Sequence, residues 1–256
     1  MNEAPLLVKT EREGRLLLLT LARPKANIVD AEMISAIQEA LDENTDRSDL
    51  AAVLITAQGP NFSFGASVEE HLPAQCEQML KTFHHLIITM LEYPLPILIA
   101  IRGYCFGGGM EVACAGNLIF AAADANFGQP EIQLGVFAPA ASCLLPERIG
   151  RAQAEDLLFS GRTINADEAF RIGLINEIVD DPETAALEYF DKQIAPRSSC
   201  ALRHAVWSAR VDMIDRVKTK LSEVEQRYLV DLMSSHDAVE GLQSFIDKRT
   251  AEWKNR

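Results

Sequence analysis

Two glutamates in the middle of the chain follow turn-forming residues. Glu111 ends the run Gly107-Gly-Gly-Met-Glu111, and Glu131 ends the run Phe127-Gly-Gln-Pro-Glu131. Two carboxyl groups flanking one water molecule suit a hydration, because one takes a proton from water while the other delivers a proton to carbon. Each run also has a purely structural interpretation, since glycines occur in plain turns and a carboxylate after proline often marks a helix start.

Small residues around Glu111 suit close contact between backbone and ligand. Glycines let the chain approach a bound group, and the helix expected behind Gly107–Gly109 presents unpaired N–H groups and a positive dipole end. A second segment of this kind, Asn61-Phe-Ser-Phe-Gly65-Ala66-Ser67, follows a predicted strand, where a simple loop is the alternative. Neither segment is a nucleotide-binding fingerprint, because GxGxxG and GxxxxGK[ST] are absent.

Other reactive side chains do not gather in ligand-like patterns. The five cysteines are scattered, odd in number and without CxxC spacing, which favours free thiols in a reducing cytoplasm over disulfides or zinc. His84 and His85 are adjacent and therefore point to different faces of a predicted helix. We expect no metal site.

Short apolar runs alternate with helical patterns along most of the chain. This order predicts an α/β fold with parallel strands joined by right-handed crossovers. The predicted strands are residues 15–21, 51–56, 97–102, 118–121 and 174–179, and the helices between them are residues 30–42, with Asp30 as N-cap, 75–91 and 166–172.

The last quarter of the chain is predicted to be helical. Helical patterns cover residues 183–193, 206–232 and 238–253, and their apolar stripes require a surface to pack against. We therefore divide the chain into a core carrying the active site, residues 1–195, and a helical region, residues 196–256, that packs on the core or on a neighbouring subunit.

Composition limits the partners. The chain has 256 residues, 48% hydrophobic, and a net charge of −13, which argues against nucleic acid and anionic membranes but not against a small phosphorylated ligand. Residues 1–10 lack the apolar run of a signal peptide, and the longest apolar segment, residues 95–101, is too short to span a bilayer. We expect a cytoplasmic protein.

Taken together, these segments resemble the signature motifs of the crotonase (enoyl-CoA hydratase) family, in the same order along nearly the whole chain. The matching segments are Arg23-Pro-Lys-Ala-Asn27, Phe64-Gly-Ala66, Gly107-Gly-Gly-Met-Glu111, Phe127-Gly-Gln-Pro-Glu131, Ser160-Gly-Arg-Thr163 with Ala166–Leu174, and Glu240-Gly to Lys248-Arg. The resemblance implies a spiral of ββα repeats with a C-terminal helical trimerisation region, and hence a homotrimer or a dimer of trimers.

The resemblance also implies roles for single residues. Ala66 and Gly108 match the backbone N–H donors of the oxyanion hole, which hold the thioester oxygen as charge develops on it. Glu111 and Glu131 match the two carboxylates of hydratases. In our hypothesis Glu111 takes the water proton, while Glu131 holds the water and completes proton delivery.

Coenzyme A is then part of an acyl-CoA substrate, and no separate cofactor is expected. Lys25 and Ala26 match the family's contact region for the adenine and phosphates, and Phe245 and Lys248 match its C-terminal helix. For each of the two lysines a solvated surface charge is the alternative.

Two segments depart from common hydratases of the family. Residues 67–73 lack the usual Asp after the oxyanion-hole alanine, and residues 136–146 replace a glycine-rich segment. Both would border the acyl pocket, so a substrate other than a plain linear enoyl chain is predicted. Phe137, Leu144 and Leu145 are candidates for shaping that pocket, with a core position as the alternative for each.

Other activities stay open from the sequence. An ordinary 2-enoyl-CoA hydratase is the first alternative, and an isomerase is disfavoured by the presence of both glutamates. A thioester hydrolase would use the same oxyanion hole. A non-catalytic RNA-binding or scaffold protein is disfavoured by the acidic charge and by the intact set of glutamates and oxyanion donors.

Overall fold

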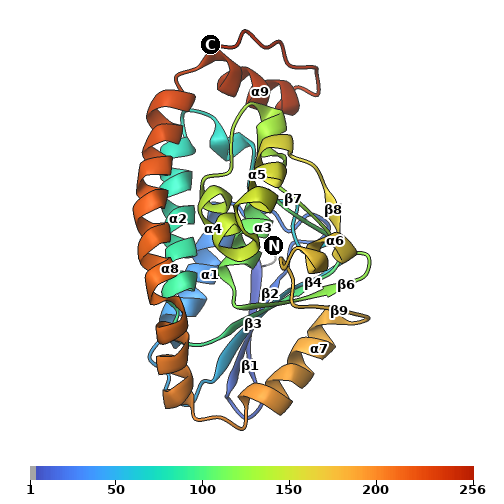
Figure 1. Ribbon diagram of the computed structural model, residues 1–256, viewed down its shortest axis with the longest axis vertical. Helices are drawn as coiled ribbons and strands as arrows, with labels where there is room; N and C mark the ends of the chain where they lie inside the picture. Colours follow the sequence, from blue (N-terminus) through green and yellow to red (C-terminus); the bar gives the residue numbers. More distant parts are fainter. Residues whose placement is uncertain (1–3) are drawn as a thin grey trace.

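A largely parallel β-sheet forms the framework of the molecule (Figure 1). The computed structural model describes residues 4–256. Within that range the strand order is β1-β2-β3-β4-β6-β9, with β1 antiparallel to β2 and all later neighbours parallel. The strands span Leu6–Glu11 (β1), Leu16–Leu21 (β2), Ala52–Ala57 (β3), Ile97–Ile101 (β4), Leu118–Ala122 (β6) and Glu177–Val179 (β9).

Both faces of this sheet are buried, because alternate side chains of a strand point to opposite sides. On β3, Val53 and Ile55 belong to one apolar cluster that includes side chains of the first two helices, whereas Leu54 belongs to a second cluster with Phe190. Strands covered on both faces read as almost continuous apolar runs. This explains why β4, with the sequence ILIAI, shows no polar alternation.

Helices cover the sheet on both sides and continue past it. They span Ala31–Asn44 (α1), Cys76–Glu92 (α2), Gly107–Ala115 (α3), Pro139–Ile149 (α4), Arg151–Ser160 (α5), Ala166–Arg171 (α6), Pro182–Tyr189 (α7), Ser199–Arg227 (α8) and His236–Ile246 (α9). Short 3-10 helices cover Glu69–His71 (η1) and Pro130–Leu134 (η2), and π-helical turns cover Phe190–Ile194 (η3) and Tyr228–Leu232 (η4).

The long helix α8 packs along α2 and α4, as Figure 1 shows at the left of the view. Helix α9 lies beside the end of the chain at the top of that view. Among residues 4–256, no helix combines the length and the apolarity needed to cross a membrane. The division of the chain at residue 195 stays a prediction.

Most predicted strands and helices are confirmed, with ends shifted by a few residues. Asp30 caps α1 as predicted, because its carboxylate accepts a hydrogen bond from Met33 N at 3.0 Å. The predicted strand 174–179 is wrong over its first half. There the N–H of Leu174 still bonds the Ala169 carbonyl in the turn that ends α6, so β9 begins three residues later.

The predicted helix 238–253 is also too long. Helix α9 ends at Ile246, and Lys248 adopts a left-handed backbone with φ +55°. The following chain folds back because the Asp237 carboxylate, near the start of α9, accepts hydrogen bonds from Lys254 N at 2.7 Å and Asn255 N at 2.6 Å. The Asp237 carboxylate therefore holds the end of the chain against the beginning of α9.

The sequence analysis did not predict a second, smaller sheet. It contains β5 (Tyr104–Phe106), β7 (Asn126–Gly128) and β8 (Ile164–Asn165) in that order. Strands of two or three residues are too short to show a period of two. Helices α4 and α5 were missed as well, because their sequences carry no clear apolar stripe, and Pro146 lies inside α4.

Candidate active site

The small sheet brings the two predicted catalytic glutamates to the same place. Strands β5 and β7 are parallel, with Phe106 opposite Gly128. The chain leaves β5 directly into α3, which carries Glu111, and leaves β7 towards η2, which carries Glu131. Because neighbouring parallel strands end at the same edge of a sheet, segments separate in sequence become adjacent.

Glu111 lies inside the protein on α3, with only 4% of its surface exposed. The helix begins at Gly107, so the glycines belong to its first turn and Glu111 lies in the second turn. One carboxyl oxygen, Oε1, accepts a hydrogen bond of 2.6 Å from Ala141 N near the start of α4. The segment that replaces the family's usual glycines thus fixes this carboxyl group.

Burial raises the pKa of Glu111, because a charge is poorly solvated in the protein interior. The Ala141 N–H and the nearby His84 act in the opposite direction. His84 itself is buried on α2, and its Nδ1 is 2.5 Å from Oε2 of Glu225 on α8. Burial and these two neighbours therefore have opposite effects on the pKa of Glu111.

The Glu131 carboxyl group points inward against the first turn of α3. A methyl group added to Gly107 would stand 2.5 Å from Glu131 Oε1, so only glycine leaves room for this carboxyl group. The buried side-chain amide of Gln129 faces the same group. With its nitrogen turned towards Glu131, it donates hydrogen bonds of 3.2 and 3.0 Å to the two carboxyl oxygens.

The pKa of Glu131 is raised well above its ordinary value, first by burial and then by the negative charge of Glu111. Two neighbouring carboxyl groups do not both ionise readily in a poorly solvated site. Ionisation of one carboxyl group therefore opposes ionisation of the other, and this arrangement suits a pair of one acid and one base.

The two predicted oxyanion donors lie side by side. A Cβ atom on Gly108 would stand 3.1 Å from Ala66 N and 3.2 Å from Ala66 Cβ. As the second residue of α3, Gly108 has an N–H without an acceptor inside the helix. Among residues 4–256, no acceptor takes up the Ala66 N–H either. Both amides are free to donate to a bound oxygen atom.

A cavity of about 60 Å³ joins these groups. Its walls come from the oxyanion loop, α3, η1, η2 and α9, and they include Ala66, Gly107 and Glu131. Glu111 and Gly108 are not among its wall residues. Gly108 lies against Ala66, and Glu111 lies four residues beyond Gly107 on α3.

The pocket-shaping residues differ from those predicted. Leu144 and Leu145 are core residues on α4, and Phe137 packs against another aromatic ring. The cavity is instead lined by Val136, together with His71 and other residues from η1, η2 and α9. Val68, His71 and Val136 lie in segments 67–73 and 136–146, which the sequence analysis singled out as bordering the pocket. The contribution of Leu242 on α9 was missed.

One ring nitrogen of His71 is hydrogen-bonded within the protein. Its Nδ1 lies 2.6 Å from the Ser67 carbonyl oxygen, which requires a proton on Nδ1. Burial lowers the pKa of His71, with the hydrogen bond to Ser67 acting in the opposite direction. A neutral imidazole therefore presents an acceptor nitrogen, Nε2.

The predicted coenzyme A contacts lie on two separate segments of the chain, and their role stays a prediction. Ala26 adjoins the oxyanion loop, because its carbonyl accepts a 2.8 Å hydrogen bond from Phe64 N. Lys25 is exposed beside it. Phe245, 55% exposed, and Lys248 lie at the end of α9. Within residues 4–256, no hydrogen bond or ion pair links this end of α9 to Lys25 or Ala26.

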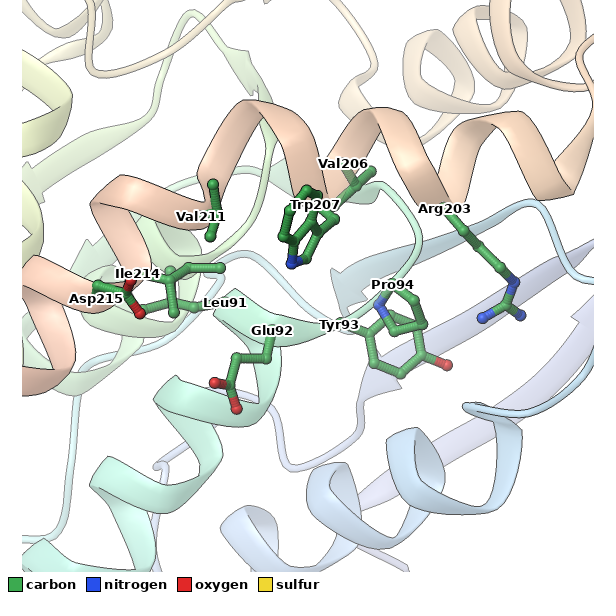
Figure 2. A pocket seen from close by; sticks show the side chains of 10 residues that line it. All are labelled: Leu91, Glu92, Tyr93, Pro94, Arg203, Val206, Trp207, Val211, Ile214 and Asp215. Atoms are coloured by element: carbon green, nitrogen blue, oxygen red, sulfur yellow. The ribbon is translucent and has the colours of Figure 1, made fainter.

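A larger cavity, of about 250 Å³, lies elsewhere, between α8 and the segment that follows α2 (Figure 2). Trp207 and Arg203 from α8 face Tyr93 and Pro94 across it. None of the predicted catalytic residues lines it. Among residues 4–256, no cluster of three or more His, Cys, Asp or Glu side chains is arranged to hold a metal ion.

Comparison with known proteins identifies the family of this chain. The family described as enoyl-CoA hydratase/isomerase matches residues 11–256. A cyclohexa-1,5-dienecarbonyl-CoA hydratase from Thauera aromatica is 62% identical over 258 residues, covering 100% of both chains. A carnitinyl-CoA dehydratase from Salmonella typhi is 31% identical, covering 96% of this chain and 97% of the relative.

Solved structures share the fold. A carnitinyl-CoA hydratase from Mycobacterium avium superimposes with a TM-score of 0.86 at 28% identity, covering 100% of each chain. A protein from Mycobacterium paratuberculosis, EchA1_1, gives a TM-score of 0.88 at 26% identity, again over 100% of each chain. The predicted crotonase-like α/β fold is thereby confirmed. The chain belongs to the enoyl-CoA hydratase/isomerase family.

Proposed function

We propose that this protein hydrates cyclohexa-1,5-diene-1-carbonyl-CoA to 6-hydroxycyclohex-1-ene-1-carbonyl-CoA, a step of anaerobic benzoyl-CoA degradation. The observation that carries the proposal is the 62% identity, over both full chains, to a cyclohexa-1,5-dienecarbonyl-CoA hydratase. The buried pair Glu111 and Glu131 beside two free backbone amides supports it chemically. The enzyme is a hydro-lyase.

The reaction is a 1,4-addition. Water's hydroxyl forms a bond to the ring carbon β to the thioester, and electrons move onto the thioester oxygen to give a dienolate. The Ala66 and Gly108 amides hold that oxygen and stabilise its charge. A proton then joins the far end of the dienolate, and the remaining double bond lies next to the thioester.

The two glutamates divide the proton transfers. Glu111 as carboxylate takes one proton from the water, while Glu131 as carboxylic acid holds the water and gives its proton to carbon. The raised pKa of Glu131 supports this assignment, because the acid must keep its proton until the dienolate forms. Transfer of a proton from Glu111 back to Glu131 completes the cycle.

The remaining parts of the proposal concern coenzyme A and assembly. Lys25 and Ala26 contact the adenine and phosphate end, and Phe245 and Lys248 contact it from α9 of the same or a neighbouring subunit. The protein works as a homotrimer or a dimer of trimers, which light scattering on the purified protein would measure as three or six chain masses. Five free cysteines fit a reducing compartment such as the cytoplasm.

The decisive experiment compares two substrates. Purified protein is incubated separately with the cyclic diene thioester and with crotonyl-CoA, and gain of one water is followed by mass spectrometry, with Glu111→Gln as control. We expect fast hydration of the diene, slow hydration of crotonyl-CoA and loss of both in the variant. Preference for crotonyl-CoA would move the protein to ordinary 2-enoyl-CoA hydration, and hydration of neither would refute the proposal.

A further inference from the structure

His71 is a polar side chain in the wall of the small cavity that the reaction described above does not use. Among residues 4–256, the wall residues with a polar side chain are His71 and Glu131. The others are glycine, alanine, proline, phenylalanine, valine and leucine residues. In a largely apolar pocket, a few polar groups decide which polar groups a ligand can carry there. The position of His71 therefore bears on the choice of ligand.

The protein fixes the imidazole ring of His71 from the oxyanion loop. Its Nδ1 lies 2.6 Å from the carbonyl oxygen of Ser67, the residue directly after the oxyanion donor Ala66. A carbonyl oxygen only accepts, so Nδ1 carries a proton and donates it. Burial lowers the pKa of His71 and so favours the neutral ring. In that ring Nε2 has no proton and acts as an acceptor.

The Nε2 atom of His71 is left for a ligand. Among residues 4–256, no protein group forms a hydrogen bond with it. It is nevertheless not one of the fully buried polar atoms without a partner, a group that includes Nε2 of His84 and the hydroxyls of Tyr93 and Tyr228. The Nε2 atom of the half-buried His71 is therefore accessible to a small molecule, whereas those three atoms are not.

An acceptor at this position fits a ligand that carries an O–H group. The acyl ring of the diene thioester has neither O–H nor N–H, but its hydration product has one hydroxyl group. Water brings two O–H bonds into the cavity, and the transfer of a proton to Glu111 breaks one of them. The other O–H bond is kept in the product. A donor without a partner in an apolar cavity is costly, so this O–H group needs an acceptor.

We propose that His71 is a specificity-determining residue whose Nε2 accepts a hydrogen bond from the hydroxyl group that hydration places on the acyl group. This inference rests on the proposed hydration. His71 takes no proton: the O–H bond facing Glu111 breaks, the C–O bond forms, and the O–H bond facing His71 stays intact. The same contact orients the water before the attack and holds the hydroxylated product afterwards.

The test deletes the hydroxyl group and the acceptor separately and together. Calorimetry measures Kd for 6-hydroxycyclohex-1-ene-1-carbonyl-CoA and for cyclohex-1-ene-1-carbonyl-CoA, which lacks the hydroxyl group. Both are measured with Glu111→Gln, which prevents dehydration, and with Glu111→Gln combined with His71→Asn. The asparagine amide can still donate to the Ser67 carbonyl in place of Nδ1, but it has no atom in place of Nε2.

We expect His71→Asn to reduce the preference for the hydroxylated thioester about fivefold, the usual effect of one neutral hydrogen bond. The Kd of the thioester without the hydroxyl group should stay within about twofold. An unchanged preference would overturn the proposal. If His71 acted only by holding the oxyanion loop, His71→Leu would weaken both thioesters equally and His71→Asn would weaken neither, which would also overturn it.

His236→Asn in the same Glu111→Gln background is the matched control. The Nδ1 of His236 is also hydrogen-bonded within the protein, at 3.1 Å from Asp237 Oδ1, and an asparagine amide can replace it there. His236 is not a wall residue of the cavity. We expect the preference for the hydroxylated thioester to stay within about twofold. An equal loss in the two variants would refute a specific role for His71.

A linear pair of ligands separates this inference from the proposed substrate. The same Kd measurements are made with 3-hydroxybutyryl-CoA and butyryl-CoA, and hydration of the diene is measured separately by mass. A preference for the linear hydroxylated thioester that depends on His71, in a protein that does not hydrate the diene, would refute the proposed substrate and support the inference. Equal affinity within both pairs, with His71 intact, would overturn the inference whether or not the diene is hydrated.

Discussion

The cavity beside Glu131 and the cavity beside Trp207 differ in size, lining and charge. The first measures about 60 Å³ and is lined by the buried Glu131, whose pKa is raised by burial and by the charge of the nearby Glu111. The second measures about 250 Å³. Two of its charged side chains have structural partners: Glu92 pairs with Lys218 at 2.6 Å, and Arg203 donates to the Arg47 carbonyl at 2.7 Å.

The comparison indicates that the size of a cavity and its ability to support a reaction are separate properties. Charged side chains at the surface that already pair with protein groups are less able to act on a substrate. Carboxyl groups that are buried in the interior resist ionisation, and such groups with shifted pKa values are typical of catalytic sites. We therefore propose that the smaller cavity is the reactive one. The following changes test that conclusion, beginning with the largest expected effect.

Replacing the acid of the small cavity should cause the largest loss. Glu131→Gln keeps the shape of the side chain but cannot deliver a proton, so we expect kcat to fall by about 10³-fold, within the usual range for general acids. Folding should not suffer. The pKa of Glu131 is raised in the folded state, so its ionisation as pH rises reduces stability, and the amide variant should melt at an equal or higher temperature at alkaline pH. Hydration at the unchanged rate would refute the role of Glu131.

A smaller loss is expected when the wall of the same cavity is altered. Gly107→Ala places a methyl group 2.5 Å from Glu131 Oε1 and on a backbone with φ +48°. The carboxyl group must move, and a displacement of about 1 Å in an active site can cost about 100-fold in rate. Steady-state kinetics on the diene thioester would measure this as a lower kcat.

Gly150→Ala provides the matched control for that change. Gly150 also has a positive φ, +76°, but a methyl group there meets no atom within 4 Å. Both variants carry the backbone strain, whereas only Gly107→Ala displaces the acid. We expect Gly150→Ala to lower stability by about 1 kcal/mol and to leave kcat within about twofold. Equal kinetic losses would show that strain, not the carboxyl group, controls the rate.

The pH profile should reveal the same carboxyl pair. An ordinary glutamate has a pKa of about 4.3. Burial raises the pKa of Glu111, and burial together with the negative charge of Glu111 raises the pKa of Glu131. As pH falls, both groups become protonated and the base is lost, so kcat/KM should decline about tenfold per pH unit, beginning well above pH 4.3. At alkaline pH the acid is lost, which gives a second limb. An acid limb at the ordinary glutamate position would contradict the buried pair.

Much of this candidate site was predictable because its residues lie in short local sequence motifs. Glycines before Glu111 and the proline before Glu131 mark the two segments, and their resemblance to family motifs supplied the roles. Long apolar runs such as those of β3 and β4 allowed the parallel sheet to be predicted for a similar reason. In each case the information lies within about ten neighbouring residues.

The rest depended on contacts between distant segments. No local pattern indicates that Ala141 N bonds Glu111 across 30 positions, or that Leu242 of α9 helps close the cavity. Strands β5, β7 and β8 are too short to carry a pattern, although they assemble the site.

The smallest effect is expected in the larger cavity. Trp207 is 63% exposed at its wall, so Trp207→Ala enlarges the space without touching a reacting group. Substitutions of exposed side chains usually change stability by about 0.5 kcal/mol or less. We expect kcat and KM for the diene thioester to stay within about twofold, measured on protein whose mass by light scattering is unchanged. A large fall in kcat at constant mass would mean that the reaction depends on the larger cavity, and the contrast between paired and unpaired charges would no longer identify the reactive site.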